Sequence, residues 1–253
     1  MADNTFAFSL RKILGMFYAR ARLVPRHWGV LVPGSAGRRF MRLLGFSSER
    51  IYPKLYCTNA EKFSLPSKKR YRRALFVGRF EPEKNIANLL AGWREYRRSG
   101  GQLEELLLVG GGSVTVDPDP TSGVIVSSWK PQEEVRKLMQ EAAVFILPSR
   151  RDHWGVVLLE AALCGCILVA SSECGAAYDL IVPGENGIRF SGLSAPVIAD
   201  ALRTVDESYA SSESLDRAIL VSRRAGEAYS TAAFVASVRS MIGAIADSAA
   251  KMG

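Results

Sequence analysis

The stretch Val144-Phe145-Ile146-Leu147 is apolar at every position. A strand with one face in water alternates apolar and polar side chains, whereas a strand covered by helices on both faces is apolar throughout. Short β-rich apolar runs recur from Ala74 onward, separated by longer stretches with helical periodicity. This order predicts an α/β fold, a Rossmann-like doubly wound parallel sheet. The expected strands are Ala74–Val77, Leu106–Val109, Val124–Val126, Val144–Leu147, Ile167–Ala170 and Gly187–Phe190, with helices near Asn85–Ser99, Glu133–Ala142 and Val156–Cys164.

Three further helical stretches follow the last expected strand, and we expect them to wrap the sheet. They are Ala195–Val205, Leu215–Tyr229 and Thr231–Ala249. We therefore predict one Rossmann-like domain with carboxy-terminal helices over residues 74–253. Residues 1–73 lack the alternating pattern and are predicted to form a basic amino-terminal extension.

The net charge of +8 is distributed unevenly over the 253 residues. Residues 1–73 carry 16 Lys and Arg against 3 Asp and Glu, a net charge of +13, so residues 74–253 carry −5. Such an asymmetry indicates an anionic partner, namely a membrane surface, a nucleic acid or an acidic neighbouring domain, or else a solvated surface. Nucleic acid is the least supported of these partners, because only the charge favours it.

The basic segment contains a candidate amphipathic helix. A serine suited to the N-cap precedes apolar side chains that share one helical face: Ser9, Leu10, Ile13, Leu14, Phe17 and Ala21. Residues 9–26 could dock this face on anionic lipid as a peripheral membrane contact. The interpretation we favour is that the face packs against protein.

The composition excludes several classes of protein. Four cysteines without a CxxC spacing and only two histidines leave no disulfide framework, no zinc motif and no Ser-His-Asp triad. Neither a GxGxxG fingerprint nor GxxxxGK[ST] occurs, which disfavours a nicotinamide-dependent dehydrogenase and a P-loop ATPase. We expect no metal and no cofactor. No apolar run reaches 18 residues, so we expect a cytoplasmic chain, at the inner face of the membrane if residues 9–26 dock there.

Ligands of open parallel sheets bind at the carboxyl ends of the strands, so the loops after the strands are informative. The first loop, residues 78–85, reads Gly-Arg-Phe-Glu-Pro-Glu-Lys-Asn. Its two cations, Arg79 and Lys84, suit a diphosphate at a helix N-terminus. The alternative is a surface ion pair with Glu81 or Glu83. The second loop begins with Gly110 and Gly111, where glycines allow a ligand to lie against the main chain.

The third loop follows Leu147 and contains two acids eight positions apart, Asp152 and Glu160. Glu160 falls among apolar residues, where an unpaired carboxylate is costly and a hydroxyl-rich partner would satisfy it. The amides of Gly155, Val156 and Val157 would lie at a helix N-terminus and suit sugar hydroxyls or phosphate oxygens. The alternative makes Asp152 a helix cap and Glu160 a structural ion-pair partner.

Pro148–Ser172, with Val77–Asn85 and Gly175–Phe190, resembles the carboxy-terminal donor-binding domain of retaining GT-B glycosyltransferases of family 4, the group 1 glycosyl transferases. The shared motifs are GRFxPEKN, an acid-x7-Glu pair with a Trp-Gly step, and GxxxDL followed by PGxNG. The resemblance implies hexosyl transfer from a UDP- or GDP-sugar to a saccharide or lipid-linked acceptor, with retention at the anomeric carbon.

The resemblance also implies roles for individual residues. Arg79 and Lys84 match the diphosphate-binding cations, and Glu160 matches the glutamate that holds the donor ribose. Asp152 matches a first glutamate that bonds the donor hexose, and it is one methylene shorter than that residue. These two acids are the donor-side catalytic candidates. The implied donor-binding set is Arg79, Lys84, Gly110, Gly111, His153, Trp154, Gly155, Val156, Val157 and Glu160.

The length departs from that family, because a GT-B enzyme has two Rossmann-like domains of about 150 residues each. Trp28–Leu65 resembles the last strand and helix of the first domain and the linker after them, so residues 1–73 are interpreted as a remnant of that domain. The expected partners are a nucleotide-sugar and either a separate amino-terminal glycosyltransferase domain or a second copy of the chain. The alternative function is a non-catalytic remnant that binds nucleotide without transferring sugar.

Overall fold

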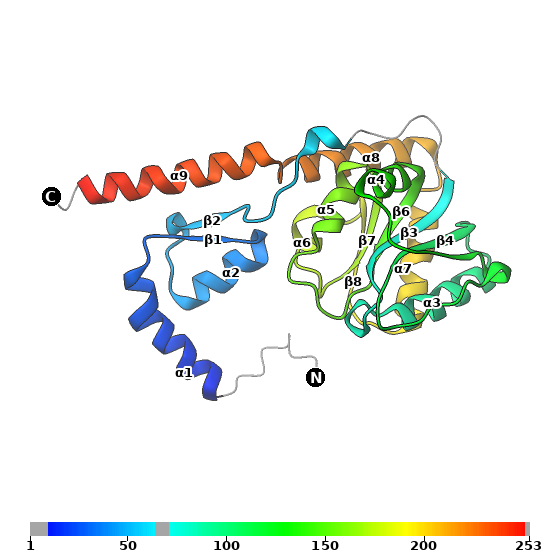
Figure 1. Cartoon of the computed structure of the whole chain (residues 1–253), viewed down its shortest axis with the longest axis horizontal. Helices are drawn as coiled ribbons and strands as arrows, with labels where there is room; N and C mark the ends of the chain where they lie inside the picture. The colour runs from blue at the N-terminus through cyan, green and yellow to red at the C-terminus, as the bar shows by residue number, and fades with distance from the viewer. Residues whose placement is uncertain (1–9, 64–70, 251–253) are drawn as a thin grey trace. The chain divides into compact units, whose positions relative to one another are not determined.

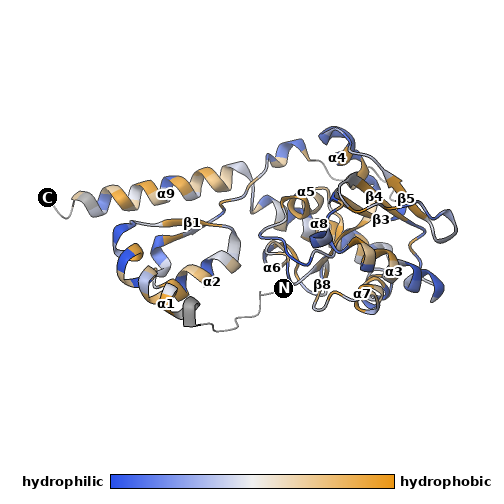
Figure 2. Ribbon diagram, turned by 60° about the horizontal axis from the view of Figure 1, so that its bottom comes forward, coloured by the Kyte–Doolittle hydropathy of each residue, from blue (hydrophilic) through white to orange (hydrophobic). Residues whose placement is uncertain are grey.

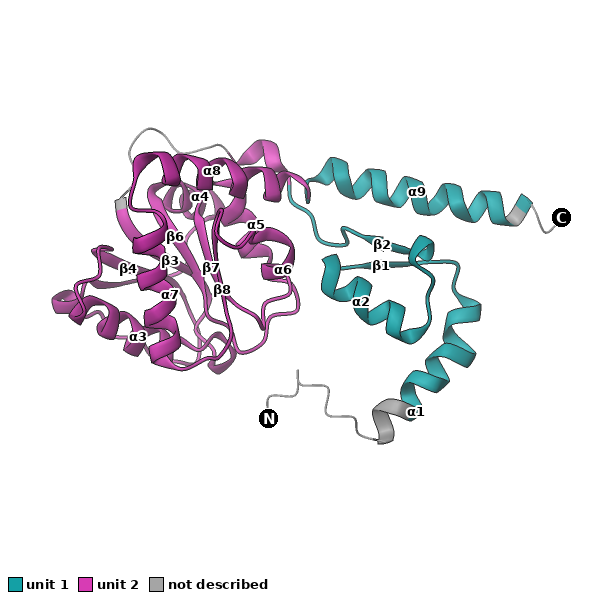
Figure 3. Ribbon diagram, turned by 180° about the vertical axis from the view of Figure 1, so that it is seen from behind, with its two compact units in different colours: residues 1–58, 229–253 teal, residues 59–228 magenta. Residues whose placement is uncertain are grey.

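The computed structural model describes residues 10–63 and 71–250 (Figure 1). The contacts divide the chain into two compact units (Figure 3), which we call unit 1, residues 1–58 with 229–253, and unit 2, residues 59–228. These limits differ from the boundary expected at residue 73. Residues 60–63 belong with unit 2 because the guanidinium groups of Arg136 and Arg223 donate to the carbonyls of Lys62 and Phe63.

Unit 2 contains a six-stranded parallel sheet in the order β5-β4-β3-β6-β7-β8. The predicted doubly wound α/β fold is therefore confirmed. Every expected strand is present, and most extend by one to three residues beyond the expected limits. The strands are β3 (Tyr71–Arg79), β4 (Glu105–Gly111), β5 (Val124–Ser127), β6 (Ala142–Leu147), β7 (Ile167–Ser171) and β8 (Gly187–Phe190).

Helices cover both faces of the sheet (Figure 1), which explains why the strands are apolar throughout. One layer consists of α3 and α7, which pack closely on each other, and α5 packs against α8 in the other. The helices of unit 2 are α3 (Ile86–Arg98), α4 (Gln132–Glu141), α5 (Val156–Leu163), α6 (Ala177–Leu180), α7 (Ala195–Ser208) and α8 (Ser212–Glu227).

The motif PGxNG lies at the start of β8, and its asparagine is a structural anchor. Asn186 is fully buried. Its Oδ1 accepts from the amide of Val182 at 2.7 Å, and its Nδ2 donates to the Leu180 carbonyl at 2.9 Å and to Ser222 Oγ at 3.1 Å. The hydroxyl of Ser222 in turn donates to the Cys166 carbonyl at 2.7 Å. One side chain thus connects α6, α8 and the start of β7.

Unit 1 is a small βαβ element with a long final helix. A parallel pair, β1 (Val30–Val32) and β2 (Ile51–Pro53), flanks α2 (Gly34–Leu44), and α1 (Leu10–Tyr18) precedes them. A small apolar cluster holds the element together: Val24, Val32, Phe46 and Ile51, with Val30, Met41 and Leu44 packed against it.

The last helix, α9 (Thr231–Ala250), belongs to unit 1, whereas the sequence led us to expect it with the helices of the sheet domain. Its residues are largely hydrophobic (Figure 2). Ser237 Oγ donates to the Pro53 carbonyl at 2.8 Å, and the amide of Thr231 donates to the Thr58 carbonyl at 3.1 Å. These bonds fix α9 beside the end of β2.

Candidate functional site

The sheet order predicts a ligand site, which we call the crevice, at the carboxyl ends of β3 and β6. After β3 the chain moves outward through β4 to β5, and after β6 it moves the other way through β7 to β8. The neighbours β3 and β6 therefore flank the topological switch point, and ligands of doubly wound sheets bind at the carboxyl ends of such strands. The loop with Arg79 and Lys84 follows β3, and the loop with Asp152 follows β6.

An ion pair joins these two loops. Lys84 Nζ donates to Asp152 Oδ2 at 2.7 Å, and the two side chains are only 19% and 15% exposed. The amide of Arg150 also donates to the Glu83 carbonyl at 2.6 Å. Lys84 therefore pairs with an acid 68 positions away and not with its neighbours Glu81 or Glu83.

Main-chain bonds fix the position of Asp152. Its amide donates to the Glu173 carbonyl at 3.1 Å, and its carbonyl accepts from the amide of Gly175 at 3.0 Å. The loop after β7 thus holds the Asp152 backbone in place, a contribution that sequence reasoning missed. The thiol of Cys174 in that loop is fully buried, and burial raises its pKa to about 12, so it is no nucleophile at neutral pH.

Arg79 ends β3 with an exposed side chain, in register with Gly111 of β4. Its neighbour Glu81 bonds to the second loop, where Ser113 Oγ donates to Oε2 at 2.5 Å and the amide of Ser113 donates to Oε1 at 3.3 Å. These hydrogen bonds lower the pKa of Glu81. The structure therefore places Arg79 at the same sheet edge as the ion pair, in contact with solvent.

The glycines of the second loop allow two strand ends to approach. Gly110 has φ of +147°, and a Cβ atom there would overlap the Gly78 carbonyl oxygen. The amide of Phe80 donates to the Gly111 carbonyl at 2.9 Å. Glycine is therefore needed at position 110 for the close approach of β4 to β3, whereas the sequence led us to expect that it lets a ligand lie against the main chain. Gly111 lies against Trp129, whose Nε1 would be 3.4 Å from a Cβ at that position.

The third loop leads into the N-terminus of α5. Gly155 has φ of +86°, a backbone conformation that glycine adopts freely, and it directs the chain into the helix. Val156 is exposed at the first position and Val157 is half-buried. His153 is exposed, whereas Trp154 is 2% exposed, so its side chain packs in the protein interior.

Glu160 lies in the same helix and is half-buried. Burial raises the pKa of its carboxyl, and a 3.3 Å hydrogen bond from Gln132 Nε2 to Oε1 opposes part of that effect. One long bond leaves most of the acceptor capacity of a carboxylate unused. Sequence reasoning missed Gln132, although its place at the start of α4, just beyond the carboxyl end of β5, was a signal.

Within residues 10–63 and 71–250 no three His, Cys, Asp or Glu side chains gather as metal ligands would. In the same part of the chain, no helix is both long and apolar enough to cross a bilayer.

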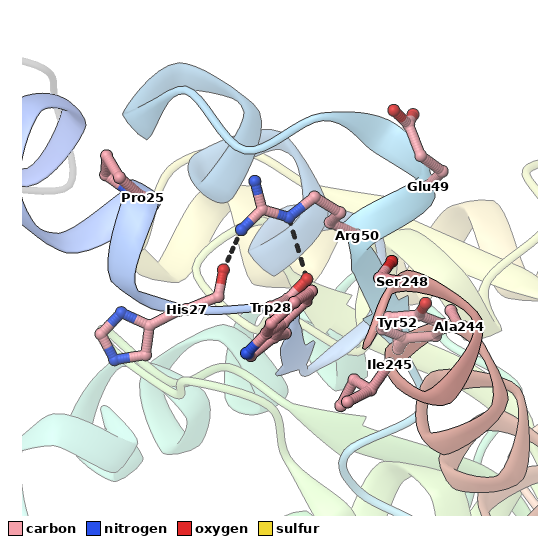
Figure 4. A pocket seen from close by; sticks show the side chains of 9 residues that line it. All are labelled: Pro25, His27, Trp28, Glu49, Arg50, Tyr52, Ala244, Ile245 and Ser248. Carbon is pink, nitrogen blue, oxygen red and sulfur yellow. Dashed lines mark hydrogen bonds between the residues drawn. The ribbon is translucent and has the colours of Figure 1, made fainter. Parts of the chain in front are cut away.

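Unit 1 has a hollow of its own, of about 590 Å³ (Figure 4). Arg50 crosses it, and its guanidinium donates to the carbonyls of Trp28, at 2.9 Å, and of His27. The charge of Arg50 therefore serves to hold the turn before β1. The hollow is lined by Pro25, His27, Trp28, Glu49, Arg50, Tyr52, Ala244, Ile245 and Ser248.

Comparison with known families explains the crevice of unit 2. Residues 58–219 match the family described as glycosyl transferases group 1. This chain belongs to that family. The matched region contains all of β3 to β8 and every residue of the crevice, and it leaves most of unit 1 outside.

Curated glycosyltransferases show the same relationship over part of their length. An alignment of 131 residues that covers 46% of this chain is 25% identical to GDP-Man:Man(3)GlcNAc(2)-PP-Dol alpha-1,2-mannosyltransferase of Eremothecium gossypii. An alignment of 147 residues that covers 52% of this chain is 27% identical to the amylovoran biosynthesis glycosyltransferase AmsK of Erwinia amylovora. The match spans only 22% of the first relative and 36% of the second.

Solved structures share the fold. Anabaena Alr3699/HepE in complex with UDP superposes with a TM-score of 0.67 at 15% identity, covering 95% of this chain and 69% of that chain. The α/β fold of this chain therefore resembles a GT-B glycosyltransferase domain.

Proposed function

We propose that unit 2 binds the nucleotide-sugar donor of a retaining family 4 glycosyltransferase. The reaction would transfer a hexosyl group from a UDP- or GDP-sugar to a saccharide or lipid-linked acceptor. The observation that carries the proposal is the junction of Lys84 and Asp152 at the switch point, beside the N-terminus of α5. The names of the relatives support it, because one mannosyltransferase uses GDP-Man and one solved structure holds UDP.

The roles proposed for the residues follow from their positions. Arg79 and Lys84 would bind the diphosphate, together with the main-chain amides at the start of α5. Glu160 would accept hydrogen bonds from the ribose hydroxyls, for which its carboxylate has unused capacity. During transfer, the two cations and the helix N-terminus would stabilise charge on the leaving diphosphate.

Asp152 requires an exchange of partners in this proposal. Without a ligand its carboxylate binds Lys84 at 2.7 Å. A bound diphosphate would attract the ammonium group, since two phosphate groups carry more charge than one carboxylate. Asp152 would then be released toward the hexose. Asp152 contacts Lys84 directly. Binding of a nucleotide to Lys84 would therefore be coupled to the orientation of Asp152, the proposed sugar-binding acid.

Replacing Glu160 with glutamine should weaken nucleotide binding and stabilise the fold. Loss of charged hydrogen bonds to the ribose should lower affinity for UDP or GDP by about tenfold to a hundredfold, measured by calorimetry. The raised pKa means that the ionised carboxylate is unfavourable in the folded state, so the variant should melt at a higher temperature at neutral pH.

The pH dependence of this stabilisation has a defined sign. Protonation of Glu160 stabilises the folded state below the unfolded-state pKa of about 4.3, and this stability is lost as the pH rises through the raised folded-state pKa. The melting difference between variant and parent should therefore grow as the pH rises. Glu133→Gln, at an exposed position of α4, is the matched control. A destabilised Glu160→Gln protein with unchanged nucleotide affinity would establish a structural role instead.

Transfer itself distinguishes an enzyme from a nucleotide-binding remnant. We expect little transfer by the chain alone, because transfer needs both reactants aligned across a closed cleft. With a candidate amino-terminal glycosyltransferase domain added, turnover of labelled UDP- or GDP-hexose on membrane extracts should give a product whose anomeric configuration, read by NMR, matches that of the donor. The Glu160→Gln protein should then give less product. An inverted anomer would contradict the retaining assignment, robust transfer by the chain alone would contradict the donor-half proposal, and tight nucleotide binding without transfer in the presence of the added domain would favour the remnant.

A further inference from the structure

Unit 1 exposes an apolar helix face that has no function in the donor crevice. Leu14, Phe17 and Tyr18 of α1 are 60%, 67% and 62% exposed. Their spacing of three and four residues places them on one side of the helix. The sequence pattern favours packing of the face that contains Leu14 and Phe17 against protein, but among the described residues these two side chains are open to solvent.

A second apolar pair lies on the outside of α2. Phe40 and Leu43 are 48% and 50% exposed, whereas Met41 and Leu44 of the same helix pack on the small apolar cluster of unit 1. The helix therefore uses one side for the core and leaves large apolar side chains on the other. Exposed apolar groups gathered in one small unit indicate an interaction surface.

The charge around these side chains is almost entirely positive. Residues 10–58 contain ten Lys and Arg and one acid, Glu49. The arginines of the turns after α1 and of α2 that stand exposed are Arg20, Arg22, Arg26, Arg38, Arg39 and Arg42. We call these six arginines, with Leu14, Phe17, Tyr18, Phe40 and Leu43, the basic apolar surface.

We propose that the basic apolar surface docks on the anionic surface of a lipid bilayer. Helices that lie in the membrane interface have large apolar side chains on one side and arginines or lysines nearby, and they need both signals to bind firmly. A bilayer supplies negative charge over its whole area, so each arginine near it adds binding without a specific partner. This inference is independent of the proposed donor site.

A second copy of the chain is a less favourable partner for the basic apolar surface than an anionic bilayer. Two such surfaces facing each other would bring like charges together, which opposes association. Unit 2 offers little compensation, because residues 59–228 have a net charge of −1. A hydrophobic interface with another protein would need a row of acids matched to the arginines, whereas an anionic bilayer provides that charge in any arrangement.

The test is co-sedimentation of the full chain with vesicles. Vesicles of phosphatidylcholine alone are compared with vesicles containing about one third phosphatidylglycerol. We expect binding to the anionic vesicles only, and strong weakening in about 1 M salt, where charges are screened within about 3 Å. Equal binding to both kinds of vesicle, or to neither, would overturn the proposal.

Variants of residues in the basic apolar surface test whether this surface binds the vesicles. Leu14→Gln with Phe17→Gln should weaken vesicle binding by about tenfold or more, because apolar side chains no longer enter the interface. Arg22→Gln with Arg38→Gln and Arg42→Gln should weaken it by about a hundredfold, at roughly a factor of five per charge.

The matched control substitutions lie in unit 2. Leu220 is 57% exposed on α8 and Arg217 is exposed on the same helix, so Leu220→Gln and Arg217→Gln should leave vesicle binding unchanged. Circular dichroism checks that all variants fold. If the α1 variant binds vesicles normally, or if light scattering shows a dimer that this variant converts to monomer, the surface serves protein association and the membrane proposal fails.

Discussion

A chain in which both Arg79 and Lys84 are alanine should lose measurable binding of UDP and GDP. Each cation is expected to make at least one charged hydrogen bond to the diphosphate, and such bonds contribute about 1.5–3 kcal/mol each. Their joint removal should lower affinity by about a hundredfold to ten-thousandfold in calorimetry. Lys137→Ala, at an exposed position of α4, is a matched loss of charge outside the crevice and should change nothing.

The ion pair allows this experiment to be resolved further. Lys84→Ala leaves the Asp152 carboxylate without its partner at the edge of the site, where it would repel the diphosphate. Adding Asp152→Asn should therefore restore part of the affinity, and the double-mutant cycle measures the coupling between the two residues. Undiminished nucleotide binding in the Arg79 and Lys84 double variant would contradict the proposal that these two residues bind the diphosphate.

The second large effect concerns the buried asparagine at the start of β8. Asn186→Leu should destabilise the protein by roughly 3–6 kcal/mol, because the Leu180 carbonyl and Ser222 Oγ each lose a buried hydrogen bond and the Val182 amide loses a part-buried one. This is a large part of the stability of a typical domain. The midpoint of urea unfolding should fall accordingly.

A neighbouring exposed residue controls for the substitution. Glu185→Gln should shift the free energy of unfolding by no more than about 0.5 kcal/mol. If Asn186→Leu unfolds at the same urea concentration as the parent but binds nucleotide less well, the PGxNG motif contacts ligand and is not the structural anchor described here.

The sequence was sufficient for the sheet because its signal is local. Runs such as Leu106–Val109 and Ile167–Ala170 are apolar throughout, and only burial on both faces accounts for that pattern. The segments that hold Arg79, Asp152 and Glu160 could be located for the same reason, since each ends or follows a strand or lies in the helix after it.

The partners of the site residues could not be predicted, because they depend on which strands become neighbours. Two acids next to Lys84 in the chain seemed the natural alternatives, but Glu81 is taken by Ser113 and Asp152 arrives from a loop 68 positions away. Gln132 reaches Glu160 across a gap of 28 positions. The open face of α1 is a further case, since periodicity identifies an apolar side without identifying what covers it.

If the crevice binds a diphosphate as proposed, the pairing of Lys84 with Asp152 would make it selective among anions. An isolated lysine would gather chloride and other small anions from solution, whereas this one already has a counter-ion at 2.7 Å within the protein. A competing anion must bind Lys84 more strongly than the Asp152 carboxylate, which is held at high local concentration. Singly charged ions fail that competition, and a diphosphate, with several oxygens and more charge, can win it. The pair would therefore keep the crevice clear of the salts that surround it until a multivalent ligand arrives.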